Sequence, residues 1–167
     1  VQGISLKELL SEEAFKTIQS AIDHYSVLIF QNQEISDEEQ FEFSRRFGLL
    51  EKATGDYMEL DDRRLPMELN DISNLNRFGD LLSPEDPKNL FSLGNMLWHS
   101  DSSFKTIPAQ YSILSAKVIP SKDGDTEYAD MRAAWVNLDE KTQQKCLGLV
   151  TEHSQIYSRG ELGFTEF

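Results

Sequence analysis

Apolar residues recur at helical spacing close to the start of the chain. Ser11, a residue type that favours helix N-caps, precedes two acidic residues that suit a first helical turn. The apolar positions that follow lie three or four residues apart: Phe15, Ile18, Ile22 and Tyr25. This spacing predicts an amphipathic helix with one face against a core.

A second helix is predicted by the capping-box pattern of Ser36 and Glu39, whose side chains can each accept a hydrogen bond from a backbone N–H at the helix start. The helix would carry Phe43 and Phe47 on its apolar face. It would end at Gly48, because glycine is common just after the last helical turn.

Short apolar or alternating runs predict strands elsewhere in the chain. The predicted strands are residues 27–30, 71–75, 96–101, 111–119 and 126–128. Two later segments, residues 131–138 and 139–150, have a helical pattern instead. The mixture predicts an α+β fold in one domain over residues 1–167.

Residues 51–91 break this pattern with polar and turn-forming residues. A long irregular stretch inside a compact domain is typical of a loop that covers a functional site. The chain begins on Val1 and ends at Phe167 within a polar stretch. We therefore expect it to be incomplete at its C-terminal side.

Composition narrows the class of function. The formal net charge is −13, which argues against a nucleic-acid partner because phosphate binding requires a basic surface. Apolar runs such as residues 27–30 cover at most four residues, far short of the ~20 residues that span a bilayer, and no membrane partner is expected. The single cysteine, Cys146, points to a reducing compartment, and we expect the protein to be cytoplasmic. A homo-oligomer is left open.

Metal chemistry is suggested by one of the three histidines. His24 and His153 lie in or beside predicted helices and are interpreted as surface or hydrogen-bonded residues. His99 and Asp101 are two residues apart on a predicted strand, so their side chains would share one face. A histidine nitrogen and a carboxylate oxygen on one face suit a facial triad around Fe(II). The tripeptide alone is a weak motif, and from these residues alone an ordinary structural role is favoured.

Longer runs carry a more specific signal. Residues 94–104 (GNMLWHSDSSF), 108–116 (PAQYSILSA) and 124–134 (GDTEYADMRAA) closely resemble the TauD/TfdA family of Fe(II)- and 2-oxoglutarate-dependent dioxygenases. Within this family the chain most resembles the 2,4-dichlorophenoxyacetate dioxygenase branch. Residues 3–6, 27–30 and 45–51 match in the N-terminal part, so the resemblance covers nearly the whole chain.

The resemblance implies a double-stranded β-helix (jelly-roll) core with flanking helices. It also implies an oxidoreductase that uses Fe(II), 2-oxoglutarate and O2 to hydroxylate a small organic acid, either aryloxyalkanoate-like or sulfonate-like, with release of succinate and CO2. His99 and Asp101 match the family's first two iron ligands and are thereby implied to be catalytic. Thr126 matches the threonine that contacts 2-oxoglutarate, and Asn95 matches an asparagine near the substrate.

The chain departs from the family pattern in three respects. The glycine pair that precedes Asp-Thr in the family is Asp123-Gly124 here. The third iron ligand, a distal histidine, and the arginine that binds 2-oxoglutarate have no counterpart in these 167 residues, and His153 matches a more central segment. No lysine is clearly aligned with the family's substrate-binding lysine. Lys52, Arg63 and Arg64 are candidates for binding an anionic substrate, and a role as solvated loop charges is an equally open interpretation.

Two other functions stay open at this point. The chain could be a truncated or degenerate, non-catalytic binding module of the same fold. Alternatively, His99 and Asp101 could hold a different divalent metal in a hydrolase or isomerase of the cupin type.

Overall fold

The computed structural model describes residues 1–52 and 63–164. It divides into two compact units, each described by itself: Val1–Gly48 with Ile113–Val150, and Leu49–Ser112 with the described residues from Thr151 onward. The prediction of one domain over residues 1–167 stays a prediction.

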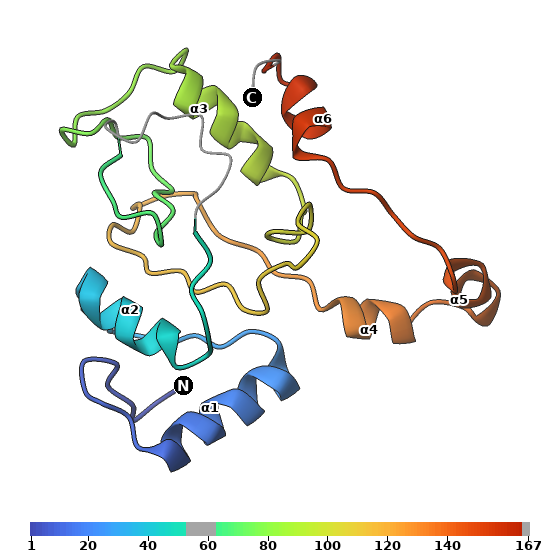
Figure 1. Ribbon diagram of the computed structural model, residues 1–167, viewed down its shortest axis with the longest axis horizontal. Helices are drawn as coiled ribbons and strands as arrows, with labels where there is room; N and C mark the ends of the chain where they lie inside the picture. The colour runs from blue at the N-terminus through green and yellow to red at the C-terminus, as the bar shows by residue number, and fades with distance from the viewer. Residues whose placement is uncertain (53–62, 165–167) are drawn as a thin grey trace. The chain divides into compact units, whose positions relative to one another are not determined.

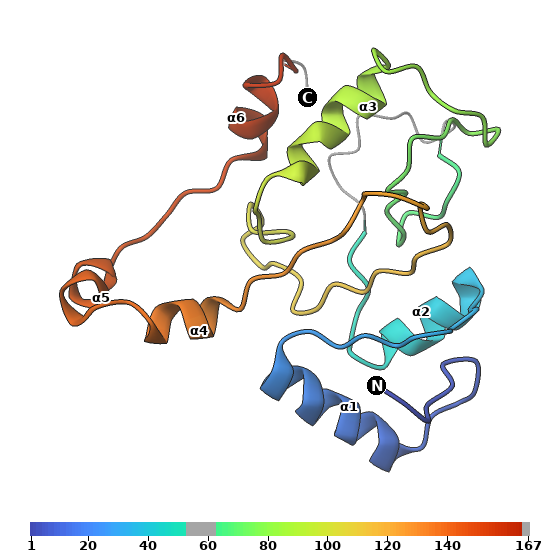
Figure 2. The same ribbon diagram turned by 180° about the vertical axis from the view of Figure 1, so that it is seen from behind.

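Helices are the regular elements of both units (Figures 1 and 2). Among the described residues they are α1 (Glu12–Tyr25), α2 (Asp37–Arg45), α3 (Pro87–Ser92), the 3-10 helix η2 (Leu93–Met96), α4 (Met131–Val136), α5 (Glu140–Cys146) and α6 (Gln155–Gly160). None of them is long and apolar enough to cross a membrane. The helices expected over residues 131–138 and 139–150 are confirmed as α4 and α5, although α5 ends at Cys146.

Helix α1 begins where the sequence predicts. Ser11 is its N-cap, and the Ser11 Oγ accepts a hydrogen bond from the Ala14 N–H at 3.2 Å. Phe15 and Ile18 are buried, whereas Tyr25 at the C-terminal end is 67% exposed. Ile22 is half-buried, so the predicted apolar stripe faces the core except at its C-terminal end.

Helix α2 has the complete capping box. The Glu39 N–H donates to Ser36 Oγ at 3.2 Å, and the Ser36 N–H donates to Glu39 Oε2 at 2.7 Å. The helix ends at Arg45, three residues before the predicted Gly48. The predicted start is thus confirmed and the predicted end is too late.

The core of the first unit forms between these two helices and the N-terminal segment. Leu6, Ile18 and Phe43 are its buried centre. Phe47 packs edge-to-face on Phe15 and Phe43, with ring centroids 4.8 and 5.4 Å apart. Partly buried apolar residues complete the cluster: Ile4, Leu10, Leu28, Phe30, Ile35 and Ile113.

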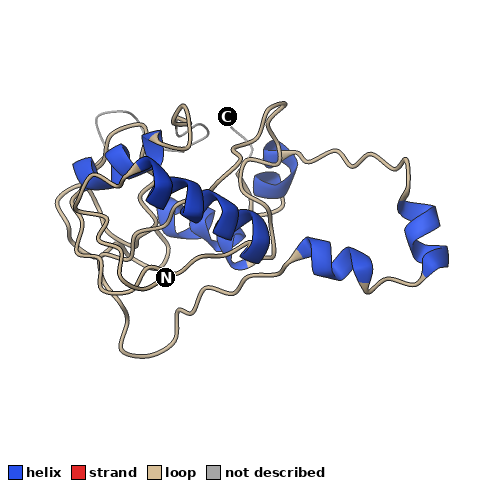
Figure 3. Cartoon of the chain, turned by 90° about the horizontal axis from the view of Figure 1, so that it is seen from below, coloured by secondary structure: helices blue, strands red, loops and turns tan. Residues whose placement is uncertain are grey.

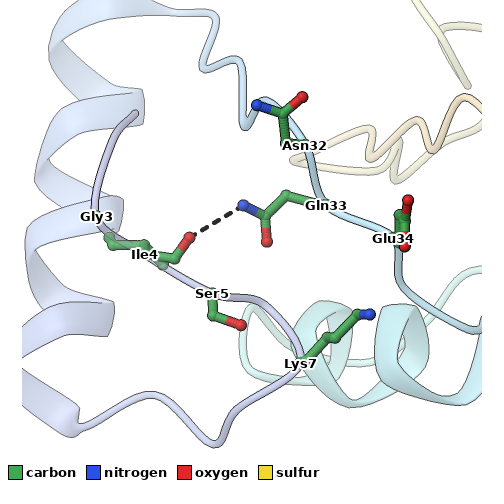
Figure 4. A pocket seen from close by; sticks show the side chains of 7 residues that line it. All are labelled: Gly3, Ile4, Ser5, Lys7, Asn32, Gln33 and Glu34. Carbon is green, nitrogen blue, oxygen red and sulfur yellow. Dashed lines mark hydrogen bonds between the residues drawn. The ribbon is translucent and has the colours of Figure 1, made fainter.

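Gln33 ties the N-terminal segment to the rest of the first unit (Figure 4). Its Nε2 donates to the Ile4 carbonyl at 3.0 Å, and its Oε1 accepts from the Leu6 N–H at 2.9 Å. The neighbouring polar surface hollow is lined by Gly3, Ile4, Ser5, Lys7, Asn32, Gln33 and Glu34. Because Gln33 already uses both ends of its amide here, its role is to hold the segment in place.

The predicted strands are wrong for the described residues. Residues 27–30, 96–101, 111–119 and 126–128 have no strand, and within 71–75 only Leu75 pairs, in an isolated antiparallel bridge with Leu81 (Figure 3). A strand is stabilised by ladder hydrogen bonds to a neighbour, and these segments have no such ladder within the part of the chain that the structure describes. Residues 111–119 are therefore irregular despite their alternation, and they contribute Ile113 to the core.

The second unit contains two α-helices, α3 and α6, and the 3-10 helix η2, none of which was predicted. Helix α3 lies within the stretch expected to be irregular, of which residues 53–62 lie outside the described residues. Asp86 caps α3 by accepting from the Lys88 N–H at 2.9 Å, and Pro87 occupies the first turn, where proline needs no hydrogen-bond partner. Helix α6 lies beside α3 in both views, and the ring of Phe91 on α3 packs on that of Phe164 at 5.3 Å (Figures 1 and 2).

Candidate functional site

His99 and Asp101 lie in the second unit, just after η2. No helix or strand is assigned at His99, and a turn begins at Asp101. The His99 Nε2 is 3.2 Å from Asp101 Oδ1. The expected proximity is therefore present, but it arises from a turn rather than from the shared face of a strand.

One polar atom of each side chain, His99 Nδ1 and Asp101 Oδ2, already has a hydrogen-bond partner. His99 Nδ1 is 2.6 Å from the Leu97 carbonyl, and the Ser112 Oγ donates to Asp101 Oδ2 at 2.6 Å. A carbonyl oxygen can only accept, so the Leu97 contact requires the proton on Nδ1 and leaves a lone pair on Nε2 in the neutral ring. The atoms that remain, Nε2 and Oδ1, are the two that face each other.

This arrangement fits two ligands of a divalent cation. An imidazole nitrogen and a carboxylate oxygen are donors for non-haem Fe(II), and outer hydrogen bonds to a carbonyl and a hydroxyl are the usual support for such ligands. The side chains of His99 and Asp101 are 45% and 57% exposed, so the pair is open to an entering ion. Among the described residues, no group of three or more histidine, cysteine and acidic side chains could hold a metal.

The turn that follows Asp101 is held by Glu51. Ser102 has a left-handed backbone (φ 57°), and its Oγ donates to Glu51 Oε1 at 2.8 Å. Lys105 Nζ donates to the same oxygen at 2.6 Å. Burial raises the pKa of Glu51, but the hydrogen bonds from Lys105 and Ser102 outweigh it, so this pKa lies below its usual value. Glu51 is therefore an ionised anchor for the turn.

Asn95, on η2, is oriented by Arg159 on α6. Arg159 Nη2 donates to Asn95 Oδ1 at 3.1 Å, and Nη1 donates to the Phe91 carbonyl at 2.8 Å. The guanidinium also stacks over the Phe91 ring at 4.3 Å. Because Oδ1 is used in this way, the Nδ2 amide group of Asn95 remains as a donor on an exposed side chain.

Thr126 belongs to the first unit and is exposed. His99 and Asp101 belong to the second unit, which is described separately, so a shared site of these three residues stays a prediction. The preceding Asp123 and Gly124 both have positive φ, 59° and 85°. Aspartate tolerates the left-handed conformation better than most residues, so the turn forms with Asp123 rather than glycine at its first position.

Two of the basic residues proposed for an anionic substrate are engaged in their own loop. Arg64 forms a two-pronged ion pair with Asp71, with both N···O distances 2.9 Å. Arg63 donates to the carbonyls of Leu65, Pro66 and Leu69. Lys52 is exposed at the last residue described before 63.

Three residues of this site were missed by sequence reasoning: Glu51, Ser112 and Arg159. Glu51 and Arg159 are 51 and 64 residues away in sequence from the side chains that they hold, Ser102 and Asn95. No local spacing signals such contacts. Ser112 stood within the second run that carries the family resemblance, but nothing in its position pointed to Asp101.

Comparison with known families gives one match over the whole chain. The model of the family described as "Taurine catabolism dioxygenase TauD, TfdA family" matches residues 1–167. This match agrees with the resemblance found in the motif-bearing runs.

Individual relatives that the chain matches are also named as dioxygenases. The chain is 39% identical to the alpha-ketoglutarate-dependent 2,4-dichlorophenoxyacetate dioxygenase of Cupriavidus pinatubonensis (strain JMP 134 / LMG 1197), over 100% of this chain and 58% of that protein. It is 34% identical to the (S)-phenoxypropionate/alpha-ketoglutarate-dioxygenase of Sphingobium herbicidovorans, over 98% of this chain and 52% of that protein. The chain thus spans about half the length of the curated relatives it matches.

A solved structure is similar in fold as well as in sequence. The crystal structure of AAD-2 in complex with Mn(II) and N-oxalylglycine superimposes with a TM-score of 0.88 at 46% sequence identity, covering 100% of this chain and 56% of that chain. The described backbone therefore has the fold of the corresponding part of AAD-2.

Proposed function

This chain belongs to the TauD, TfdA family of dioxygenases, and from that premise we propose that it contains the first two iron ligands of an Fe(II)- and 2-oxoglutarate-dependent dioxygenase. The substrate is a small organic acid of the aryloxyalkanoate class, the class that the names of the most similar relatives give. The sulfonate-like alternative has less support, because four relatives that are 32–39% identical to this chain are named for 2,4-dichlorophenoxyacetate or phenoxypropionate.

One observation of this structure carries the proposal. His99 Nε2 and Asp101 Oδ1 face each other at 3.2 Å, while Leu97 and Ser112 occupy the outer atoms. A neutral imidazole nitrogen and an anionic carboxylate oxygen are left without another partner among the described residues. A cation that both atoms coordinate from adjacent positions would satisfy both lone pairs.

The bound iron would supply activation of O2 for the oxidative decarboxylation of 2-oxoglutarate and the hydroxylation of the substrate. His99 contributes a neutral nitrogen, with its proton held on Nδ1 by the Leu97 carbonyl. Asp101 contributes a negative charge that partly neutralises the cation. A third ligand and a residue that pairs with 2-oxoglutarate are also required, and the described residues offer no group of three metal-binding side chains.

Thr126 and Asn95 have roles toward the two organic ligands in this proposal. The Thr126 hydroxyl binds a carboxylate of 2-oxoglutarate, following the turn at Asp123 and Gly124. The Asn95 amide, oriented by Arg159, donates from Nδ2 to an oxygen of the substrate. AAD-2 was crystallised with N-oxalylglycine, which has the two-carboxylate framework of 2-oxoglutarate, and this supports a dicarboxylate site in the family fold.

The jelly-roll core is also part of the proposal. Segments 111–119 and 126–128 have no assigned helix or strand in this chain. The relatives that it matches are nearly twice as long, and in a protein of that length these segments would pair as strands of a double-stranded β-helix.

The half-length coverage favours one alternative, a non-catalytic binding module of the same fold. Such a module would not bind Fe(II) together with 2-oxoglutarate, and it would not turn over a substrate. The two functions therefore differ in a direct binding measurement.

The experiment is anaerobic addition of Fe(II) and 2-oxoglutarate to the protein encoded by the complete gene. The expected result is the visible metal-to-ligand charge-transfer band of the chelate. His99→Ala removes a ligand and should abolish the band. His153→Ala should preserve it, because the described hydrogen bond of the His153 ring is to Thr151 Oγ1 at 3.3 Å. Absence of the band in the wild-type protein would favour the binding module.

Substrate class is tested separately, by succinate release with a panel of acids. We expect 2,4-dichlorophenoxyacetate and phenoxypropionate to stimulate release and taurine to have little effect. Stimulation by taurine alone would overturn the aryloxyalkanoate assignment without affecting the iron site.

A further inference from the structure

We infer that Ser112 is a positioning residue for the metal site, which holds the Asp101 carboxylate so that Oδ1 is left for the cation. The inference rests on the proposed function, because it concerns the same pair of ligands. Ser112 lies outside the His-x-Asp motif, eleven residues after Asp101 along the chain.

The contact selects one of two chemically equivalent oxygens. The Ser112 Oγ–H donates to Asp101 Oδ2 at 2.6 Å, a distance typical of a hydrogen bond to an ionised carboxylate. Oδ1 then faces His99 Nε2 at 3.2 Å. Rotation about the Cβ–Cγ bond of an aspartate is broad and would exchange the two oxygens. The Ser112 bond therefore determines which oxygen points to His99.

Packing does not provide this orientation. The Asp101 side chain is 57% exposed, and within the described part of the chain its hydrogen-bond and ion-pair partners are His99 and Ser112. An exposed side chain retains its rotamer freedom unless a polar contact restrains it, and ordering it at the moment of binding weakens affinity. Ser112 reduces this cost by ordering the carboxylate beforehand.

A second contact acts on the backbone rather than on the carboxylate. Glu51 holds the turn through Ser102 and Lys105, which fixes where the chain goes after Asp101. It contacts neither Asp101 oxygen through a hydrogen bond. The two restraints are therefore separable, and Ser112 is the residue whose loss would change the side-chain orientation alone.

The expected consequence is a change in metal affinity. Loss of a hydrogen-bond partner of a metal ligand typically weakens binding by about 10–100-fold. Because Ser112 contacts Asp101 and not the cation, its removal should leave the same ligands in place. Affinity would fall, but metal binding would still require His99 and Asp101.

The test uses the protein encoded by the complete gene and Mn(II) alone as the probe, without 2-oxoglutarate or substrate. Free Mn(II) is followed by its electron paramagnetic resonance signal during a titration. We expect Ser112→Ala to raise the Kd by about 10–100-fold. Ser112→Thr keeps the hydroxyl and should remain close to the wild-type Kd.

Two further variants make the outcomes distinguishable. Ser115→Ala removes a hydroxyl three residues away in the same segment and should bind like the wild type. Asp101→Ala should lose binding. Two results would overturn the role of Ser112. In the first, Asp101→Ala loses Mn(II) binding while Ser112→Ala binds like the wild type. In the second, Ser112→Thr binds as weakly as Ser112→Ala. If Asp101→Ala binds Mn(II) normally, the proposed function itself fails.

Discussion

The guanidinium of Arg159 fills the space that a side chain at position 94 would need. A Cβ on Gly94 would lie 1.5 Å from Arg159 Nη1 and 2.7 Å from Cζ. The absence of a side chain thus lets α6 approach η2 and lets Arg159 reach Phe91 and Asn95. Burial lowers the pKa of Arg159 below its usual value, although an arginine stays protonated at neutral pH.

Gly94→Ala should therefore displace Arg159 and break its two hydrogen bonds. We expect the free energy of unfolding to fall by roughly 1–3 kcal/mol, since each bond contributes about 1 kcal/mol and a charged donor contributes more. The measurement is urea denaturation of Gly94→Ala, Arg159→Met and the double variant. In the Arg159→Met background the alanine should cost much less, because the clashing group is gone; equal costs in both backgrounds would contradict the contact.

Asp71 should make the stability of the second unit depend on pH. Burial raises the pKa of Asp71, but hydrogen bonds from Arg64, Ser73 and Lys88 lower it by more than burial raises it. The pKa therefore falls from the usual 3.8 to about 2. A carboxyl whose pKa is lower in the folded state stabilises the protein above the unfolded pKa, and this contribution is lost as pH falls from about 4 to about 2. Asp71→Asn should lose roughly 2 kcal/mol at pH 7 and differ less from the wild type at pH 2.

Unfolding free energies at several pH values between 7 and 2 check this prediction. Glu85→Gln is the matched control, because Glu85 is exposed in the same unit. A wild-type pH profile as flat as that of Asp71→Asn would show that the Arg64 and Lys88 contacts contribute nothing.

Arg132 should stabilise the end of α1. Its guanidinium donates to the carbonyls of Asp23 and His24 and to Ser26 Oγ. A cation at a helix C-terminus satisfies carbonyls that have no intrahelical partner and interacts favourably with the helix dipole. Arg132→Met should cost roughly 1–2 kcal/mol.

Amide hydrogen exchange in the last turn of α1, together with urea denaturation, measures the effect. Lys122→Met removes an exposed charge elsewhere in the same unit and should change neither. Unaltered exchange at α1 in Arg132→Met would exclude the capping role.

The turn before Thr126 should require glycine at only one of its two positions. Gly124 has φ 85°, and a Cβ there would lie 3.0 Å from Pro120 Cγ. Gly124→Ala should therefore destabilise the protein by about 1 kcal/mol or more. Asp123→Gly, which restores the family's glycine pair, should be nearly neutral, because aspartate tolerates its φ of 59°.

Thermal unfolding of both variants compares the two positions. If Asp123→Gly lowers the melting temperature as much as Gly124→Ala, the turn depends on contacts of the Asp123 side chain and not on backbone conformation.

Local patterns were sufficient for α1 and α2 because both partners of each cap lie within three residues. Ser11 and the Ser36–Glu39 pair fix the helix starts through contacts that need no other part of the chain. The same kind of signal was present for α3, in Asp86 and Pro87. There the proline was interpreted as a turn residue, although it is also favoured in the first turn of a helix.

The strand predictions failed for a physical reason. Alternation in 111–119 shows which side chains can share a face, but a strand forms only when a second strand accepts its hydrogen bonds. The sequence of one segment does not contain its partner. Within the described residues the only such pairing is the bridge between Leu75 and Leu81.

By itself, the sequence determined the local and chemical part of this protein: the caps of the first two helices, the family, and the histidine and aspartate two residues apart. Only the tertiary structure decided which atoms of that pair remain for a ligand. Ser112 reaches the Asp101 side chain across eleven residues, and Glu51 and Arg159 reach Ser102 and Asn95 across 51 and 64. Contacts over such separations depend on how the chain folds back on itself, and residue spacing carries no record of that path.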